Sequence, residues 1–338
     1  MTSLLNDQHH ADLAIRAAGL TRRFGEQVAV DGIDLAIPTG EIYGFLGPNG
    51  AGKSTTVRML VTLLAPSDGD AWVAGASVRY QPDAVRLRIG VALQDASLDG
   101  QQTGIELLRL QGRLYGLSRR QVDRRVAAMA DLADLGDALG RQVKTYSGGM
   151  RRRLDLAAAL VHDPDVLFLD EPTTGLDPAS RTRVWDEVRR LNHELGMTIF
   201  LTTQYLEEAD QLAHRVGIIA GGRIAAEGTP ADLKRRVGDD LVVVRTLGGL
   251  DGVADRLRAI AAVQRVEVRD RELTVVTPDG AKVVGRVALA LEEAGVGIED
   301  LTLRTTTLDD VFLEVTGDRM RARDHQPSPV PATTGAAG

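Results

Sequence analysis

The stretch Gly47-Pro48-Asn49-Gly50-Ala51-Gly52-Lys53-Ser54 decides the fold of this chain. It has the form G-x-x-x-x-G-K-[ST], and it stands between an apolar strand candidate, Ile42–Leu46, and a helix candidate, residues 53–64. Glycines let the backbone curl so that successive N–H groups point at phosphate oxygens, and the positive end of the helix faces the same anion. Lys53 is expected to reach the β- and γ-phosphates of a nucleotide, and Ser54 to bind Mg²⁺. The alternative, an ordinary glycine-rich turn from strand to helix, fits this complete pattern poorly.

A second apolar strand candidate ends in two carboxylates. The run Val166–Leu169 is followed by Asp170 and Glu171. Asp170 is expected to hold the Mg²⁺ shell, and Glu171 to orient and deprotonate a water in line with the γ-phosphate. Alone, this pair could be a solvated turn at a strand end, but with the phosphate loop upstream it indicates a nucleoside triphosphatase. The guanine-reading pattern Asn-Lys-x-Asp is absent from the sequence, which favours ATP.

Composition and charge narrow the class of protein further. The chain has 338 residues, 43% of them hydrophobic and 26% charged, as in ordinary globular proteins of two or three domains. The net charge of −7 argues against a nucleic-acid partner, and the lack of cysteine excludes disulfides and thiolate metal sites. No window of about 18 apolar residues occurs, and residues 1–10 do not have the pattern of a signal peptide. We therefore expect a cytoplasmic protein that reaches a membrane through a partner.

The pattern of elements predicts two folded blocks. Residues 12–237 alternate strand and helix candidates, which is typical of an α/β fold with a mostly parallel sheet, and residues 101–165 are largely helical. Residues 240–317 are predicted to form strand, helix, strand, strand, helix and strand, the ferredoxin-like order of an α+β domain, followed by a short helix at 308–315. We expect a flexible N-terminus over 1–11 and disorder over 318–338, and the second block carries no catalytic residues of its own.

A third motif, Tyr146-Ser147-Gly148-Gly149-Met150, carries a family resemblance. With the phosphate loop and the Asp170-Glu171 pair, it resembles the signature of the ATP-binding subunits of ABC transporters, although Tyr146 and Met150 replace the usual leucine and glutamine. The alternative for Ser147 is an ordinary helix cap. The resemblance implies an ABC ATPase cassette of the P-loop class, with a mixed sheet and a helical subdomain. It also implies a homodimer in which Ser147, Gly148 and Gly149 of one copy close over the ATP held by the other.

The resemblance assigns further residues by position. Gln94 is expected to contact Mg²⁺ and sense the membrane partner, Asp177 to lie in the segment that crosses between subunits, and Phe24 to stack on adenine, with core packing as its alternative. Gln204 stands where the family usually has a histidine that touches the γ-phosphate, so we expect hydrolysis to survive but to be slow. Arg151 to Arg153 is interpreted as a solvated face of the signature helix. The residues expected to contact ATP are Phe24, Gly47, Pro48, Asn49, Gly50, Ala51, Gly52, Lys53, Ser54, Thr55 and Gln94; those expected to be catalytic are Glu171, Lys53 and Gln204; those expected to bind Mg²⁺ are Ser54, Gln94 and Asp170.

The end of the second block sharpens the resemblance. The stretch from Thr307 to Gly317, with the run Thr202–Leu206, looks like the daunorubicin/doxorubicin resistance ATP-binding proteins. That resemblance implies ATP-driven export of antibiotics through two copies of a separate membrane permease, with this chain peripheral on the cytoplasmic face. Two alternatives stay open: an exporter of another compound, and a soluble ABC-type ATPase that acts on ribosomes or DNA.

Overall fold

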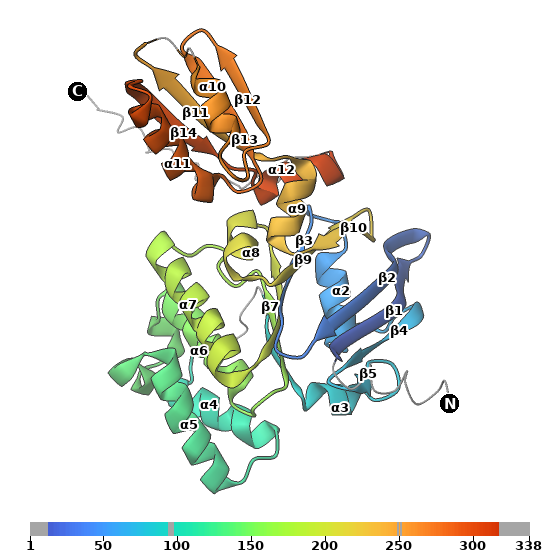
Figure 1. The fold of residues 1–338 in the computed structure, drawn as a ribbon. Coiled ribbons are helices and arrows are strands. Elements are labelled where there is room, and N and C mark those ends of the chain that lie inside the picture. Colours follow the sequence, from blue (N-terminus) through green and yellow to red (C-terminus); the bar gives the residue numbers. More distant parts are fainter. Residues whose placement is uncertain (1–12, 94–97, 249, 251, 318–338) are drawn as a thin grey trace, which may run out of the picture.

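The computed structural model describes residues 13–93, 98–248, 250 and 252–317. An ATPase domain with a central sheet carries a smaller second domain, and the helices α9 and α12 lie at the junction (Figure 1). The expected Gln94, the N-terminus 1–11 and the tail 318–338 lie outside the described residues. The strands of the ATPase domain are β1 (Leu13–Phe24), β2 (Gln27–Pro38), β3 (Ile42–Leu46), β4 (Asp68–Val73), β5 (Ala76–Ser77), β6 (Ile89–Ala92), β7 (Val166–Asp170), β8 (Thr198–Thr203), β9 (Arg215–Ala220) and β10 (Arg223–Gly228).

The central sheet of the described chain has the order β10-β9-β3-β8-β7-β6. Strands β6, β7, β8, β3 and β9 pair in parallel, and β10 pairs with β9 in antiparallel fashion. Strands β3, β7 and β8 are buried at every position, as expected of parallel strands that have elements packed on both faces. A second, antiparallel sheet has the order β2-β1-β4-β5. The prediction of a mixed α/β cassette is thereby confirmed.

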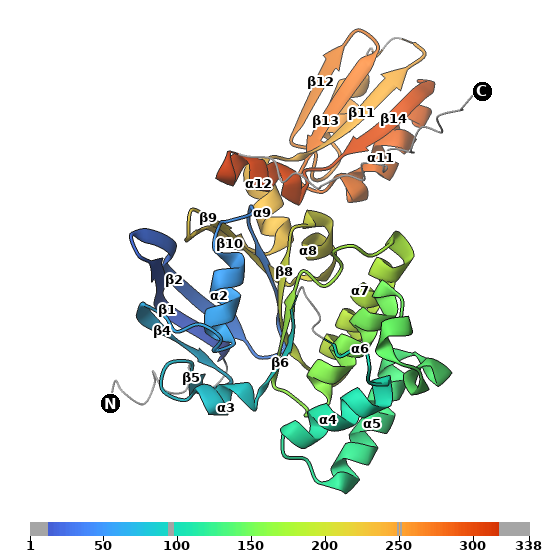
Figure 2. The same ribbon diagram turned by 180° about the vertical axis from the view of Figure 1, so that it is seen from behind.

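The helices cover the two faces of the central sheet. Helix α2 packs on one face together with the antiparallel sheet, while α4 to α7 build the core on the other face (Figures 1 and 2). The helices and short 3-10 turns of the ATPase domain are α2 (Lys53–Leu60), α3 (Pro82–Arg86), α4 (Gly104–Leu114), α5 (Arg119–Ala133), η1 (Gly136–Gly140), η2 (Val143–Thr145), α6 (Gly148–Leu160), α7 (Pro178–Leu195), α8 (Leu206–Leu212) and α9 (Pro230–Val237). The helical stretch expected over 101–165 thus holds α4, α5 and α6.

Side-chain caps explain where several of these helices begin. Thr103 and Ser118 each open a helix with a capping box, in which the cap and the third helical residue satisfy each other's backbone N–H groups. Asp177 caps α7 and is followed by Pro178, whose fixed φ suits the first helical position. The side chain of Ser147 caps α6. Two segments of functional interest, at 147 and at 177, are therefore also the starting points of helices.

The second domain has the predicted ferredoxin-like order. Its sheet runs β12-β13-β11-β14 with every neighbouring pair antiparallel, and helices α10 and α11 pack on it. Helix α12 instead packs back on α8, α9 and β10 of the ATPase domain, where Phe312 is fully buried. The elements of this domain are β11 (Asp240–Thr246), α10 (Val253–Arg258), β12 (Arg265–Arg269), β13 (Glu272–Thr277), α11 (Gly280–Glu293), β14 (Ile298–Arg304) and α12 (Leu308–Thr316).

Candidate nucleotide-binding and catalytic site

The phosphate loop joins the end of β3 to the start of α2. Gly50 and Gly52 take positive φ values of 81° and 112°, which favour glycine. A Cβ at Gly47 would lie 2.4 Å from the carbonyl oxygen of Ile219, and one at Gly52 would lie 2.6 Å from that of Ala29. Gly47 and Gly52 at the two ends of the loop thus leave no room for a side chain, and the positive φ of Gly52 favours glycine as well.

Lys53 lies at the base of this loop. Only 6% of the residue is exposed, and its Nζ donates to the carbonyl oxygens of Gly47 at 2.6 Å and Pro48 at 3.2 Å. Burial lowers the pKa of Lys53, and the nearby carboxylates of Glu171 and Asp170 oppose that shift. Lys53, Asp170 and Glu171, which the sequence predicts to act together, are therefore close enough to interact. Ser54 and Thr55 follow at the helix start, and Ser54 is exposed.

Asp170 and Glu171 stand where β7 ends beside β8. Asp170 is 8% exposed, and its Oδ1 accepts a hydrogen bond from the Thr202 hydroxyl. The backbone N–H of Glu171 donates to the carbonyl and hydroxyl oxygens of Thr202, at 3.0 and 3.2 Å. Glu171 has a positive φ of 49°, an uncommon value for a residue with a side chain, and such strain often marks functional sites. From the neighbouring strand, Thr202 thus holds the carboxylate of Asp170 and the backbone of Glu171.

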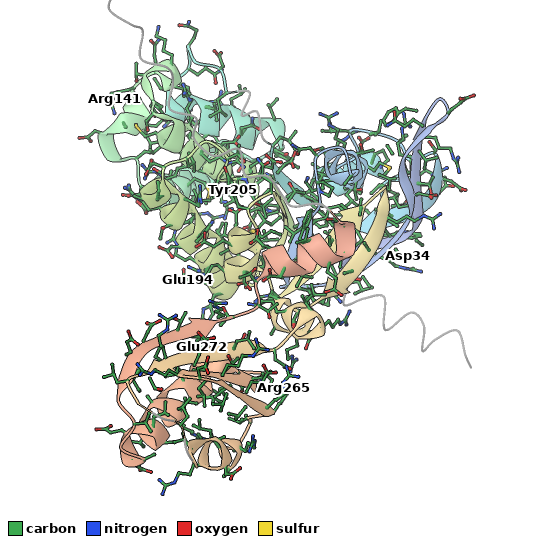
Figure 3. All side chains as sticks on the ribbon, turned by 90° about the horizontal axis from the view of Figure 1, so that it is seen from above. Asp34, Arg141, Glu194, Tyr205, Arg265 and Glu272 are labelled. Carbon is green, nitrogen blue, oxygen red and sulfur yellow. The ribbon has the colours of Figure 1, made fainter. Side chains whose placement is uncertain are left out.

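Gln204 contacts the expected base directly. Its Nε2 donates to Glu171 Oε2 at 3.3 Å, and the Thr174 hydroxyl donates to the same oxygen at 3.2 Å. The amide therefore orients the carboxylate from the next strand end. Tyr205 follows Gln204 and lies within the ATPase domain, whereas Arg265 and Glu272 mark the second domain (Figure 3). Sequence reasoning missed Thr174 and Thr202. For Thr202 the available signal was its place in the parallel strand next to the carboxylates.

The signature segment lies across the central sheet from the phosphate loop. Helix α6 and helix α2 pack on opposite faces (Figures 1 and 2). Ser147 is exposed, and its Oγ accepts from Met150 N at 3.3 Å. A Cβ at Gly149 would lie 3.3 Å from Ser180 Oγ, and Ser180 in turn donates to Asp177. The signature and the expected crossing segment are thus neighbours, whereas the helix that follows the phosphate loop packs on the other face of the sheet.

The interpretation of Arg151 to Arg153 as a solvated face is wrong for two of the three residues. The Arg152 side chain is 11% exposed and donates to backbone carbonyls, and Arg153 donates to the carbonyl oxygens of Ala133 and Asp134. Only Arg151 is exposed. Helix α6 packs on the core and against the end of α5, so Arg152 and Arg153 donate to backbone carbonyls inside the domain.

Phe24 ends β1 and is 47% exposed, so core packing does not explain it. The Arg22 guanidinium lies 4.6 Å from the centre of its ring. Its cross-strand partner Gln27 is two residues from Ala29, which touches Gly52 of the phosphate loop. Phe24 therefore presents an aromatic face at the end of the hairpin nearest the loop, and its stacking on adenine stays a prediction.

Comparison with known proteins agrees with this geometry. The ABC transporter family matches residues 30–174, and the C-terminal domain of DrrA1-3-like ATP-binding proteins matches residues 228–316. The daunorubicin resistance ATP-binding protein DrrA3 of Streptomyces coeruleorubidus is 48% identical over 316 residues, which cover 93% of this chain and 99% of that protein. The daunorubicin/doxorubicin resistance ATP-binding protein DrrA of Streptomyces peucetius is 48% identical over 307 residues, covering 90% and 92%.

Among solved structures, the fold is similar to an ATP-binding cassette captured as a dimer with ADP and phosphate after hydrolysis. That similarity has a TM-score of 0.58 at 23% identity and covers 64% of this chain and 98% of the other. That solved cassette is thus a nucleotide-bound dimer of the same fold. The chain matches both the ABC transporter family and the C-terminal domain of DrrA1-3-like proteins. It also covers nearly the whole length of both relatives. This protein therefore belongs to the DrrA family of ABC transporter ATP-binding proteins.

Proposed function

We propose that this protein hydrolyses Mg²⁺·ATP as a homodimer and powers export of an antibiotic through a separate membrane permease. The observation that carries this proposal is the cluster at the end of β7, where Glu171 is held by Gln204 and Thr174 beside Asp170 and Lys53. The names of the relatives support the drug-export part.

The residues present fit a magnesium ion bound together with nucleotide. Asp170 supplies a carboxylate and Ser54 an exposed hydroxyl, which are the oxygen donors that Mg²⁺ prefers. Within the described ranges, no group of three or more His, Cys, Asp or Glu residues could hold a metal. When bound, the ion would also take oxygens from phosphate and water, and it would neutralise charge on the β- and γ-phosphates.

Each catalytic residue has a distinct task in this proposal. The Glu171 carboxylate accepts the proton of the attacking water, and the Gln204 amide holds that carboxylate in one orientation. Lys53 balances negative charge on the transferred phosphoryl group. Gln204 and Thr174 fix the Glu171 carboxylate, so little reorganisation is needed at the moment of reaction.

A second copy completes the site. Ser147, Gly148 and Gly149 stand at the start of α6, where a helix N-terminus offers free N–H groups to an anion. Because α6 and α2, the helix that follows the phosphate loop, pack on opposite faces of the sheet, we infer that the signature reaches the γ-phosphate of the partner copy instead of its own. The two copies would bind two ATP molecules and dock on two permease subunits at the cytoplasmic face of the membrane. Among the helices that the structure describes, none is long and apolar enough to cross a bilayer.

The test measures assembly and transport separately. Glu171→Gln protein with ATP and Mg²⁺ should sediment as a dimer, whereas the same variant carrying Ser147→Arg should stay monomeric, since the new side chain blocks the signature surface. A monomeric Glu171→Gln protein at saturating ATP, even with the permease present, would refute the shared site.

Vesicles with the permease should accumulate daunorubicin in an ATP-dependent manner. Failure there, with intact hydrolysis, would point to a different cargo.

A further inference from the structure

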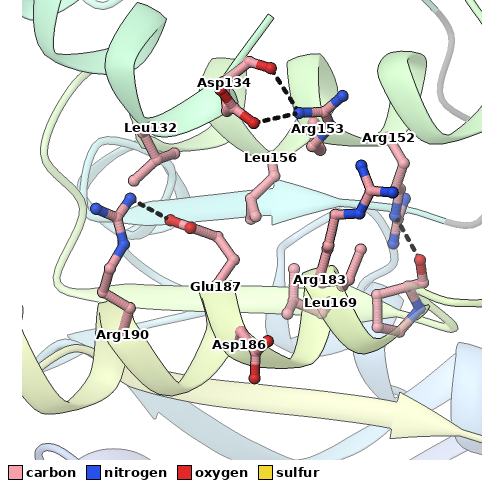
Figure 4. Close-up of a pocket in the computed structure, with 12 residues that line it drawn as sticks. Leu132, Asp134, Arg152, Arg153, Leu156, Leu169, Arg183, Asp186, Glu187 and Arg190 are labelled. Atoms are coloured by element: carbon pink, nitrogen blue, oxygen red, sulfur yellow. Dashed lines mark hydrogen bonds and ion pairs between the residues drawn. The ribbon is translucent and has the colours of Figure 1, made fainter. Parts of the chain in front are cut away.

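Arg152 joins three segments of the ATPase domain through one buried guanidinium. Its Nε donates to the carbonyl oxygen of Pro172 at 3.0 Å and its Nη1 to that of Leu93 at 2.8 Å. Arg152 lines the pocket between α6 and α7 (Figure 4), and Pro172 belongs to the same lining. The Arg152 guanidinium therefore donates its hydrogen bonds to backbone carbonyls on the sheet side of α6.

The two carbonyls belong to segments that carry the proposed chemistry. Pro172 directly follows Glu171, and Leu93 is the last described residue before Gln94. Nη2 also lies 3.5 Å from the carbonyl oxygens of Ala92 and Asp170, at the limit of a hydrogen bond. One side chain thus spans the ends of β6 and β7.

The helix that carries Arg152 also carries the signature. Ser147 caps α6, and Arg152 lies just over one turn further along the same helix. An α-helix moves as a rigid element, so a displacement of its capped end moves the guanidinium and, with it, the Pro172 carbonyl. Asp155, one turn beyond Arg152, accepts from Nη1 at 3.1 Å and supplies the countercharge.

Resting on the proposed function, we propose that Arg152 is a positioning residue: it couples the signature helix to the segment that carries Glu171. Contact of the signature with the partner's ATP would then set the position of the base in its own copy. Arginine suits this task because its planar fork offers several donors in fixed directions, whereas the single ammonium of lysine cannot hold two separate carbonyls in the same way.

The experiment compares two neighbouring arginines. Arg152→Lys keeps the charge and the Asp155 partner but removes the fork, and we expect its kcat for ATP to fall between about tenfold and 10²-fold, the scale of a misplaced catalytic group. The matched control is Arg153→Lys, because Arg153 lies on the same helix but donates to the end of α5. Its kcat should stay within twofold of wild type, roughly the scatter of such assays. Equal kcat losses in the two variants would overturn the proposal.

Two further measurements separate positioning from general stability. In the Glu171→Gln background, Arg152→Lys should cause no further loss of kcat, and its ATP dissociation constant by equilibrium dialysis should equal that of Glu171→Gln alone. A full additional loss would mean that Arg152 acts elsewhere. If Arg152→Lys does not fold, Arg152→Gln with Asp155→Asn removes the buried pair together and should show the same kcat loss. Wild-type activity in that variant would overturn the proposal.

The outcomes also distinguish this inference from the proposed function. If wild-type protein neither binds nor hydrolyses ATP, the proposed function fails. If wild-type protein turns over and Arg152→Lys does so equally well, only the role of Arg152 fails.

Discussion

Glu171 is the residue on which the chemistry depends. Replacing it with glutamine keeps its shape and its contacts with Gln204 and Thr174 but removes the proton acceptor. We expect ATP turnover to fall by about 10²–10⁴-fold, the usual contribution of a general base, with ATP binding unchanged. A phosphate-release assay and equilibrium dialysis measure the two quantities. Glu194→Gln on the exposed end of α7 is the control and should change neither (Figure 3). Unchanged turnover in Glu171→Gln would remove Glu171 from this role.

Gln204 differs chemically from the histidine usual at its position. The amide donates to Glu171 Oε2 but carries no charge, so it gives less electrostatic help at the γ-phosphate. Gln204→His should therefore raise ATP turnover or leave it similar. Gln204→Ala is the companion variant, and it should lower kcat because the carboxylate loses one of its two side-chain donors. A loss above about tenfold in Gln204→His, or 1.4 kcal/mol of barrier, would reveal a role of the amide beyond orientation.

Asp155 predicts a pH dependence of stability. Burial raises the pKa of Asp155 from 3.8 to about 6, although the Arg152 guanidinium opposes the shift. The folded state therefore binds this proton more tightly than the unfolded state does. The resulting stabilisation is complete below pH 3.8 and is lost as the pH rises through about 6.

Urea denaturation at pH 4 to 7.5 tests this dependence. The free energy of unfolding of wild type minus that of Asp155→Asn should decrease as the pH rises, because asparagine does not titrate. Taking the difference cancels the other titrating groups. A difference that is flat across the range would contradict the shifted pKa.

At the scale of elements, α7 and α8 are fastened side by side. Trp185 Nε1 donates to Glu208 Oε1 at 2.9 Å, and the Arg181 guanidinium lies 4.5 Å from the centre of the Tyr205 ring. Glu208 is fully buried, and its burial raises the pKa of the carboxyl. Helix α7 follows Asp177 and α8 follows Gln204, so these contacts hold the crossing segment and the catalytic amide in one unit.

Trp185→Phe should destabilise this unit by about 1–3 kcal/mol, the cost of leaving a buried acceptor without its donor. The free energy of unfolding in urea is the measurement. The chain has two tryptophans, and Trp72→Phe provides the matched control. No hydrogen bond from the Trp72 indole is found in the described ranges, and the Arg16 guanidinium stacks on its ring instead. Equal losses in the two variants would mean that the hydrogen bond to Glu208 contributes little.

Elements with strong patterns are predicted well from the sequence. Ile42–Leu46 forms β3 as expected, and the strands and helices of residues 240–317 follow the predicted order, with the last helix within one residue of its expected bounds. Within β2, Gly32 at a φ of 68° lets the ladder with β1 continue through an irregularity, which the residue pattern alone does not predict. Strands β4, β6 and β10 were missed, since each is short and mixes small or charged residues with apolar ones.

The candidate site is predicted unevenly, and for a physical reason. Lys53, Asp170 and Glu171 have motifs with fixed spacing, so their meeting follows from the fold. The contacts of Thr202 depend on which strands are neighbours, and those of Arg152 depend on how α6 packs on the sheet. Neither is visible in local sequence. A run of arginines on a helix usually lies on its solvated face, and this expectation is wrong for Arg152 and Arg153.

At the scale of the whole molecule, α12 ties the second domain to the first. Phe312 and Val311 are buried against Leu206, Leu233 and other apolar side chains of the ATPase domain. Deleting residues 240–317 should leave ATP binding intact, because the phosphate loop lies entirely in the ATPase domain. The truncated protein should nevertheless unfold at a lower temperature, because the surface under α12 becomes exposed.

Equilibrium dialysis with ATP and thermal denaturation are the measurements for the truncated protein. Its control is the truncation 1–317, which keeps both domains and α12 and should match the full chain in both assays. A folded protein that lacks residues 240–317 and fails to bind ATP would show that the two blocks are not separable.

The position of α12 has a consequence for how this chain is made. Leu46 leaves the ribosome early and Phe312 leaves it late, yet both residues belong to one apolar cluster. A chain released before residue 308 would therefore bare Leu206, Leu233 and their neighbours to solvent, and chaperones and proteases recognise such surfaces. Only a chain translated through α12 therefore covers these apolar side chains, and shorter copies expose a surface that quality-control factors bind.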